Sequence, residues 1–424
     1  MRVLHVSDLH IGKRVNGMSM LDDQRFILRQ ILDIAAKRQV SALLIAGDIY
    51  DKASPSAEAV TVFDAFLTDA VAAGLRVLAI PGNHDSAERI AYAQGLLEAQ
   101  GVWFPPVYEG AVEHVEFADE HGPVVFWLVP FLKPGDVRRF FPDAEIGDDY
   151  SAALRAVCNA CDVDQEKRNV VLSHQLVTAC GAAPERADDE IKLGGIDNVD
   201  VSVYDAFDYV ALGHVHRPQR VGRDTVRYSG SPLKYSFSEA RYSKSVVLVD
   251  LGEKVPGSAA GACVSAELVP LVPLHDVREV RGTLADVLAM GAAGHAPAAA
   301  GEEGAPAADG GLPAADDERD PSQDYLHITL SDEHPQLDAM AKVHEVFPNA
   351  MTLDYDNVTV LVNRPQAAAI DPDSMDTLEL FATFYESQVG SGLDEVQRAF
   401  MRKTIAQVED GVARGIAGQE GGAE

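Results

Sequence analysis

The chain has 424 residues, of which 47% are hydrophobic, and its 35 Lys and Arg against 66 Asp and Glu give a net charge of −31 at pH 7. This length predicts about two to three domains. Four cysteines exclude a disulfide scaffold and favour a reducing compartment, and no apolar run approaches the roughly 20 residues that span a bilayer. The acidic total weighs against a protein that binds DNA phosphates, although it does not say where the charge lies.

Short apolar runs alternate with helical patterns over the first 250 residues. Apolar residues at helical spacing predict helices over 21–37 and 55–72, the second with Ser54 as its N-cap. The alternation predicts an α/β layered domain over residues 1–255. Buried strands are expected in runs of branched aliphatic residues that end at polar ones: 2–7, 41–46, 76–80, 124–129, 169–172, 209–212, 228–232 and 245–251.

The composition changes after about residue 290. Residues 291–321 are rich in Ala, Gly, Pro and acidic residues without hydrophobic periodicity, which predicts a disordered insertion. The insertion interrupts a small α+β domain expected over 256–370, and a hairpin of two amphipathic helices is expected over 375–410. Within the α+β domain, strands are predicted over 264–272, 324–330 and 351–355 and a helix over 336–346.

Five clusters of polar side chains each follow a predicted strand directly, where open α/β sheets place their sites. Residues i and i+2 of an extended backbone point the same way, so Asp8 and His10 can reach one ion, and His214 and His216 one centre. The clusters are Asp8-Leu9-His10, Gly47-Asp48-Ile49-Tyr50-Asp51, Gly82-Asn83-His84-Asp85, Ser173-His174-Gln175 and Gly213-His214-Val215-His216.

Together these clusters offer two carboxylates, one amide oxygen and at least four imidazoles, which is more than one ion needs. Mixed oxygen and imidazole donors suit Mn, Fe or Zn better than Ca. Asp48 is the natural bridge between two ions because a carboxylate has two oxygens. Two ions about 3.5–4 Å apart acidify a bound water and hold a phosphoryl group, so the predicted reaction is phosphoester hydrolysis.

The ordered set DLH, GDIYD, GNHD, SHQ and GHVH resembles the calcineurin-like metallophosphoesterases, and within them the SbcD-type nucleases and their archaeal and eukaryotic relatives. The resemblance implies a layered αββα sandwich with a small α+β capping domain and a C-terminal helical hairpin. The phosphatase branch usually follows the second aspartate of the second motif with Arg-Gly, whereas Asp51 is followed here by Lys52-Ala53, as in the nucleases.

The resemblance also implies roles for individual residues. His84 would stabilise transition-state charge or protonate the leaving oxygen. Asp85 would either orient His84 or cap the helix that starts near Ser86. One metal would be held by Asp8, His10, Asp48 and His216, and the other by Asp48, Asn83, His174 and His214.

Two further features bear on partners. Residues 201–250 hold seven Lys and Arg against five Asp and Glu, so Arg217 and Lys234 either contact nucleic acid or lie on an ordinary solvated surface. The hairpin over 375–410 either packs on its own domain or binds the coiled-coil base of an SbcC-type ATPase, as the resemblance implies. Cys158 and Cys161 have the spacing of a redox or zinc motif but lie in a helical pattern, and we interpret them as free thiols.

The sequence therefore predicts a two-metal DNA phosphodiesterase with Mn²⁺, or Mg²⁺ as the alternative. The resemblance implies ATP-dependent exonuclease activity on duplex ends and endonuclease activity on single strands or hairpins, in a homodimer within a heterotetramer. No P-loop motif is present, so ATP would be bound by the partner. A cytoplasmic location is expected. The alternatives are a phosphomonoesterase or cyclic-nucleotide phosphodiesterase on the same fold, and a non-catalytic DNA scaffold protein.

Overall fold

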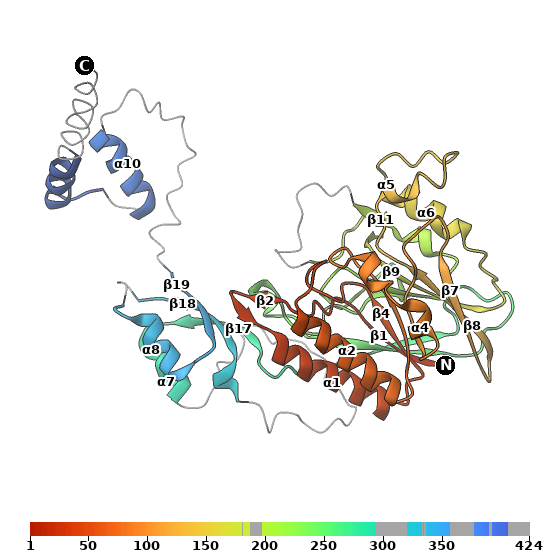
Figure 1. The fold of residues 1–424 in the computed structure, drawn as a ribbon. Helices are drawn as coiled ribbons and strands as arrows, with labels where there is room; N and C mark the ends of the chain where they lie inside the picture. The colour runs from red at the N-terminus through yellow and green to blue at the C-terminus, as the bar shows by residue number, and fades with distance from the viewer. Residues whose placement is uncertain are drawn as a thin grey trace, which may run out of the picture. The chain divides into compact units, whose positions relative to one another are not determined.

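Two six-stranded sheets form the body of the protein in a computed structural model, which describes residues 1–179, 181–186, 197–292, 320–332, 334, 336–356, 377–389 and 392–405 (Figure 1). In order across the first sheet, the strands are β16 (Val264–Pro270), β15 (Ser245–Leu251), β1 (Arg2–Val6), β4 (Ala42–Ala46), β5 (Arg76–Ile80) and β6 (Val102–Trp103). In order across the second, they are β13 (Gln219–Val221), β14 (Arg223–Tyr228), β12 (Tyr209–Gly213), β9 (Arg168–His174), β8 (Gly122–Val129) and β7 (Glu113–Asp119).

The centre of each sheet is parallel. Strands β1, β4, β5 and β6 run parallel in the first sheet, and β8, β9, β12 and β14 run parallel in the second. Antiparallel strands β15 and β16 complete one side of the first sheet, and β7 and β13 form the edges of the second. Parallel pairing brings the carboxyl ends of the central strands to one edge of each sheet, where the polar clusters follow.

The side chains of the central strands alternate between two cores, as the period of two in a strand requires. Leu43 and Ile45 of β4 pack with helices α1 (Leu21–Lys37) and α2 (Ala57–Ala72). Leu44 of the same strand faces the second sheet and packs with residues such as Phe126.

A third core lies between the second sheet and α6 (Tyr150–Ala160). Figure 1 shows α1 and α2 side by side and α5 (Pro134–Val137) with α6 in a separate group. The four layers confirm the predicted αββα sandwich.

Smaller elements connect and flank the sheets. They are the hairpin β2 (Arg14–Val15) with β3 (Met18–Ser19), the pair β10 (Leu176–Thr178) with β11 (Asn198–Asp200), and helices α3 (Ala87–Ile90) and α4 (Gln94–Glu98). A three-stranded sheet has the order β17 (Val277–Gly282), β18 (Tyr325–Leu330) and β19 (Ala350–Tyr355), with α7 (Leu284–Ala292) and α8 (Ala339–Val346) in its connections. Near the end of the chain are α10 (Thr377–Val389) and a helix over 395–405.

Several predicted boundaries were wrong. The N-cap of α2 is Ser56 and not Ser54, because it is the Ser56 side chain that accepts the N–H of Ala59. The strand expected over 228–232 ends at Tyr228, because Gly230 takes a left-handed φ of 74° and turns the chain.

The domain boundary predicted at 255/256 also differs from the structure. β16 pairs along the whole length of β15 and so completes the first sheet instead of belonging to the α+β domain. Residues 291 and 292 end α7, and residues 293–319 of the predicted insertion lie outside the described residues. Contacts divide the chain into two compact units, one of Met1–Val280, Leu288–Ile328 and Met340–Thr352, the other of Arg281–Val287, Thr329–Ala339 and Leu353–Glu424.

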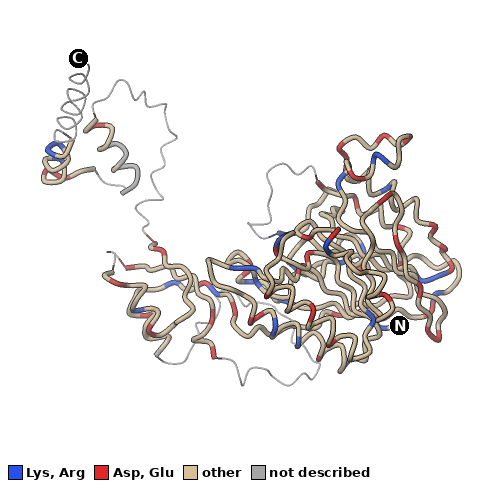
Figure 2. The backbone as a smooth tube through the Cα atoms, in the orientation of Figure 1, with Lys and Arg blue, Asp and Glu red and all other residues tan. Residues whose placement is uncertain are grey.

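Charged residues of both signs are interspersed along the described strands and helices (Figure 2). The charged residues that the structure describes are therefore not confined to one element. Among the described helices, none combines the length and the apolar character needed to cross a membrane. Cys158 and Cys161 are buried free thiols, as predicted, and burial raises the pKa of Cys161 to about 12.

Candidate metal centre

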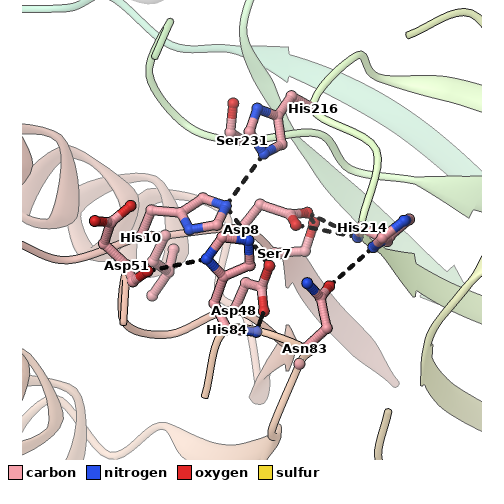
Figure 3. A network of polar contacts seen from close by, with 12 residues as sticks. Ser7, Asp8, His10, Asp48, Asp51, Asn83, His84, His214, His216 and Ser231 are labelled. Carbon is pink, nitrogen blue, oxygen red and sulfur yellow. Dashed lines mark hydrogen bonds and ion pairs between the residues drawn. The ribbon is translucent and has the colours of Figure 1, made fainter. Parts of the chain in front are cut away.

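The polar clusters meet at one place, although they come from both sheets: Figure 3 shows residues of four of them, and His174 of the fifth lies within 3.4 Å of Asn83 and Asp48. Asp8 and His10 follow β1, and Asp48 follows β4. Asn83 and His84 follow β5, His174 ends β9, and His214 and His216 follow β12. The fold therefore brings all seven predicted metal ligands to the adjoining carboxyl ends of the two sheets.

One group of donors consists of Asp8, His10 and His216, whose ligand atoms lie within 4.8 Å of one another. The Nε2 atoms of His10 and His216 are 3.1 Å apart. The His216 ring donates from Nδ1 to Glu239 Oε1 at 3.1 Å, so the lone pair of its Nε2 faces His10. Ligands about 2.1 Å from one metal and at right angles lie about 3 Å apart, which matches this separation.

A second group is centred on the Asn83 side chain. Its Oδ1 lies 3.1 Å from His174 Nε2 and 3.0 Å from His214 Nδ1. The His174 ring donates from Nδ1 to the Ala46 carbonyl at 2.8 Å, so Nε2 is the ring atom that faces Asn83 and would bind a metal. These contacts are again the separations expected of neighbouring ligands on one ion.

Asp48 lies between the two groups. Its Oδ2 is 3.4 Å from His174 Nε2 in the second group and 3.7 Å from His10 Nε2 in the first. Its other oxygen, Oδ1, accepts the backbone N–H of His84 at 2.8 Å. This placement fits the bridging role expected of the carboxylate.

The electrostatics of the centre favour positive charge beside Asp48. Burial alone would raise the pKa of Asp48, but the imidazoles of His174 and His10 outweigh it and hold that pKa well below its usual range. Burial opposes the charging of His174, yet the Asp48 carboxylate outweighs it and raises the pKa of the imidazole to about 9. Burial is the main cause that raises the pKa of Asp8. A buried site that stabilises a cation in this way, with this donor set, fits divalent metal ions.

The loops that carry the donors have unusual backbone conformations. Asp8, His10, Asp48 and His214 have φ angles of 53°, 43°, 49° and 106°, in the region that favours glycine, at a cost of about 1–3 kcal/mol each. Hydrogen bonds between the loops hold them there. The Asp8 N–H donates to the Gly47 carbonyl at 3.0 Å, the His10 N–H to the Asp48 carbonyl at 3.0 Å, and the His214 N–H to the Asp8 carboxylate.

Two glycines allow the loops to approach so closely. A Cβ on Gly82 would lie 2.2 Å from Asp48 Oδ1, and a Cβ on Gly47 would lie 2.2 Å from His174 Nδ1. Both separations are far below van der Waals contact. Any other residue at either position would displace a donor of the centre.

His84 lies beside the first group of donors, where its ring is close to His10 and Asp48. It packs edge-on against His10, with 4.8 Å between the ring centres, and its Nδ1 donates to the Asp51 carbonyl at 2.9 Å (Figure 3). A carbonyl only accepts, so Nδ1 carries the hydrogen and Nε2 is the atom left to meet a substrate.

Asp85 neither orients the His84 ring nor caps the following helix, which were the two roles expected of it. Its carboxylate does not bond to the His84 ring among the described hydrogen bonds, and the cap of α3 is the Ser86 side chain. Burial, followed by the charge of Asp48, raises the pKa of Asp85 to about 6. The carboxylate accepts, at 2.9 Å each, three backbone N–H groups from the loops after β4 and β5: those of Ile49, Tyr50 and Gly82.

The two basic residues expected to contact nucleic acid differ in accessibility. Arg217 pairs with Glu185 and lies over the Tyr242 ring, with its side chain 40% exposed. Lys234 is only 12% exposed, because its Nζ pairs with Asp276 Oδ1 at 2.9 Å and donates to a backbone carbonyl at 2.7 Å. Arg217 is therefore the more accessible of the two.

A buried ion pair that no sequence motif predicted lies behind the centre. Glu239 accepts from His216 and pairs with Lys244, whose Nζ also donates to the His216 carbonyl at 2.9 Å. Burial alone would raise the pKa of Glu239, but Lys244 and His216 outweigh it and lower that pKa to about 2. A carboxylate behind a metal-binding imidazole fixes its tautomer and orientation.

The chain is similar to several known proteins. The family model for calcineurin-like phosphoesterases matches residues 1–218, and that for the type 5 capsule protein repressor C-terminal domain matches residues 273–389. The SbcD nuclease of the SbcCD complex of Staphylococcus epidermidis is 26% identical over 416 residues, covering 97% of this chain and 99% of its own. A solved dimetal phosphatase from Danio rerio is 12% identical over 63% of this chain and 98% of its own, with a TM-score of 0.35.

Proposed function

Because the chain belongs to the calcineurin-like phosphoesterase family, we propose that it is a two-metal DNA phosphodiesterase, the nuclease component of an SbcCD-type complex. The observation that carries this proposal is the convergence of seven metal donors from both sheets, with Asp48 within 3.7 Å of an imidazole of each group. A non-catalytic scaffold would have no need for a complete donor set of this kind.

The chain's own residues have separate tasks in this reaction. Asp8, His10, Asp48 and His216 would hold one ion, and Asp48, Asn83, His174 and His214 the other. When bound, two divalent ions, Mn²⁺ in this proposal with Mg²⁺ as the alternative, activate water and neutralise the charge of the phosphoryl group. His84 would direct Nε2 at the phosphodiester, where a protonated ring stabilises developing charge or protonates the leaving oxygen.

DNA is the proposed substrate because the similarity extends beyond the metal centre. The nuclease relative is aligned over almost the whole chain, and a second family model covers residues 273–389, beyond both large sheets. Of the predicted α+β domain, residues 271–370, which follow β16 of the first sheet, would then form a cap over the DNA, with Arg217 as the first candidate for a phosphate contact. The proposed activities are ATP-dependent cleavage from duplex ends and endonuclease cleavage of single strands or hairpins.

The partner of the proposed complex is an SbcC-type ATPase bound through residues 375–410. In this hairpin, Gln397 Nε2 donates to Tyr385 Oη at 3.2 Å and so links the helix over 395–405 to α10. Val396 and Phe400 are 79% and 67% exposed, as expected of an apolar surface that binds another protein. ATP would be bound by the partner, and two copies of each chain would form a cytoplasmic heterotetramer.

A nuclease assay with a metal titration tests the proposal. Purified protein with Mn²⁺ or Mg²⁺ should degrade linear duplex DNA and nick hairpins, and the SbcC-type ATPase with ATP should stimulate cleavage at open and blocked ends. Elemental analysis should find two ions per chain, and Asp48→Asn should lower that number. Hydrolysis of small phosphoesters without any cleavage of DNA would instead favour a phosphomonoesterase or cyclic-nucleotide phosphodiesterase.

A further inference from the structure

Lys13 lies just beyond the first pair of metal donors and has no part in the centre described above. Its Nζ is 3.2 Å from Asp51 Oδ1, and the two side chains are only 19% and 16% exposed. The Lys13 N–H donates to the His10 carbonyl at 3.0 Å, and its Nζ lies 5.6 Å from the centre of the Tyr235 ring. Lys13 thus links the loop after β1 to the loop after β4.

Asp51 is held by the loop after β1 at two points. Its N–H donates to the Ile11 carbonyl at 3.2 Å, and its carboxylate pairs with Lys13. The Asp51 carbonyl accepts Nδ1–H of His84 at 2.9 Å. The Asp51 carbonyl, which belongs to the peptide unit between Asp51 and Lys52, therefore anchors the His84 ring.

The neighbour of His84 in the chain cannot do the same task, because the Asp85 carboxylate is occupied by three backbone N–H groups. Asp51 is therefore the group that orients the His84 ring, and Lys13 is the cation that holds the Asp51 side chain. We propose that Lys13 is a positioning residue, which through Asp51 fixes His84 for proton transfer to the leaving oxygen. This inference rests on the proposed phosphodiesterase function.

The size of the expected effect follows from the partial burial of the pair. A charge pair so little exposed is screened weakly, and without Lys13 the Asp51 carboxylate would turn toward water and shift its peptide unit. A displacement of about 1 Å at a catalytic group costs up to about 100-fold in rate. Lys13→Met should therefore lower kcat about 10- to 100-fold, whereas Lys13→Arg, which keeps the charge, should restore most of the rate.

The test is a double-mutant cycle of Lys13→Met with His84→Gln on two thymidine phosphodiesters, one that releases p-nitrophenolate and one that releases phenolate. A residue that protonates the leaving oxygen accelerates the reaction most when the leaving group is poor, and phenolate is a poorer leaving group than p-nitrophenolate. Lys13→Met should lower kcat on the phenyl ester about 10-fold or more, change KM less than about 2-fold, and add nothing in the His84→Gln background. Exposed Lys37 serves as the matched control through Lys37→Met, and metal content should stay unchanged in all variants.

Three results would overturn the inference. Losses that multiply in the double variant would mean that Lys13 acts independently of His84. A rise in KM alone would make Lys13 a substrate-binding cation, and loss of metal would make its role structural. Because the cycle is measured on aryl esters, a protein that hydrolyses them but cleaves no DNA would refute the nuclease assignment and still decide the role of Lys13.

Discussion

Glu239→Gln tests how much a residue that orients a metal donor, without being a donor itself, contributes to stability and metal binding. Glutamine keeps an oxygen that can accept from His216, but it removes the charge that faces Lys244, whose side chain is only 4% exposed. The pKa of Glu239 falls from 4.5 to about 2 in the folded protein, which corresponds to roughly 3 kcal/mol of stabilisation at neutral pH. Breaking a buried pair costs about 3–5 kcal/mol, so we expect a loss near 3 kcal/mol.

Calorimetry of the metal-free protein and titration with Mn²⁺ would measure the two effects of Glu239→Gln separately. The melting temperature should fall by about 6–10 °C, and metal affinity should weaken about 10- to 100-fold. Glu267→Gln, which breaks an exposed pair with Arg38, is the matched control and should cost less than about 1 kcal/mol. Adding Lys244→Met should recover stability but not metal affinity. Equal melting temperatures for Glu239→Gln and the unchanged protein would refute the reasoning.

Three further changes test other parts of the structure. Gly82→Ala should abolish metal binding measured by titration because its Cβ would meet the bridging carboxylate, while Gly95→Ala, with open space around it, should bind metal normally. Burial lowers the pKa of His5 to about 3, so the unfolded chain alone takes up this proton between pH 6.5 and 3. The free energy of unfolding should therefore fall by up to about 5 kcal/mol as the pH is lowered over that range. Urea melts should show a shallower fall for His5→Gln than for the unchanged protein, and equal slopes would contradict this. Phe400→Asp should prevent co-purification with the ATPase without changing metal-dependent activity alone, in contrast to Leu337→Asp, another exposed apolar position.

The convergence of the candidate metal donors was predictable because each lies at the end of a buried strand or just after it. Residues 42–46 and 77–80 are apolar without interruption, and Asp48 and Asn83 come at the first polar turn after them. Parallel strands then bring their carboxyl ends to one edge whatever the details of the loops. The alternation of strands and helices predicted a layered α/β domain, and the resemblance to the calcineurin-like metallophosphoesterases implied the αββα order of its layers.

The contacts that orient the donors were not predictable in the same way. Glu239 is 23 residues beyond His216, and nothing in its local pattern marks it as buried. The left-handed backbone of Asp8 and Asp48 depends on hydrogen bonds between loops, since neither residue type demands that conformation alone. β16 was assigned to the wrong domain because strand pairing with β15 is a tertiary preference that no periodicity records.

The packing between the two sheets is itself part of the metal centre. The donors after β1, β4 and β5 belong to the first sheet, and those after β9 and β12 to the second, so the apolar layer between the sheets sets the distance between the two sets. Two polar links cross that layer close to the centre: the His214 N–H donates to the Asp8 carboxylate, and the His5 ring bonds to Tyr209 Oη at 3.0 Å. A core this dense does not deform gradually, so a change in it would move whole donor sets rather than single side chains. The stability of the sandwich and its affinity for metal are therefore coupled through residues that never touch an ion.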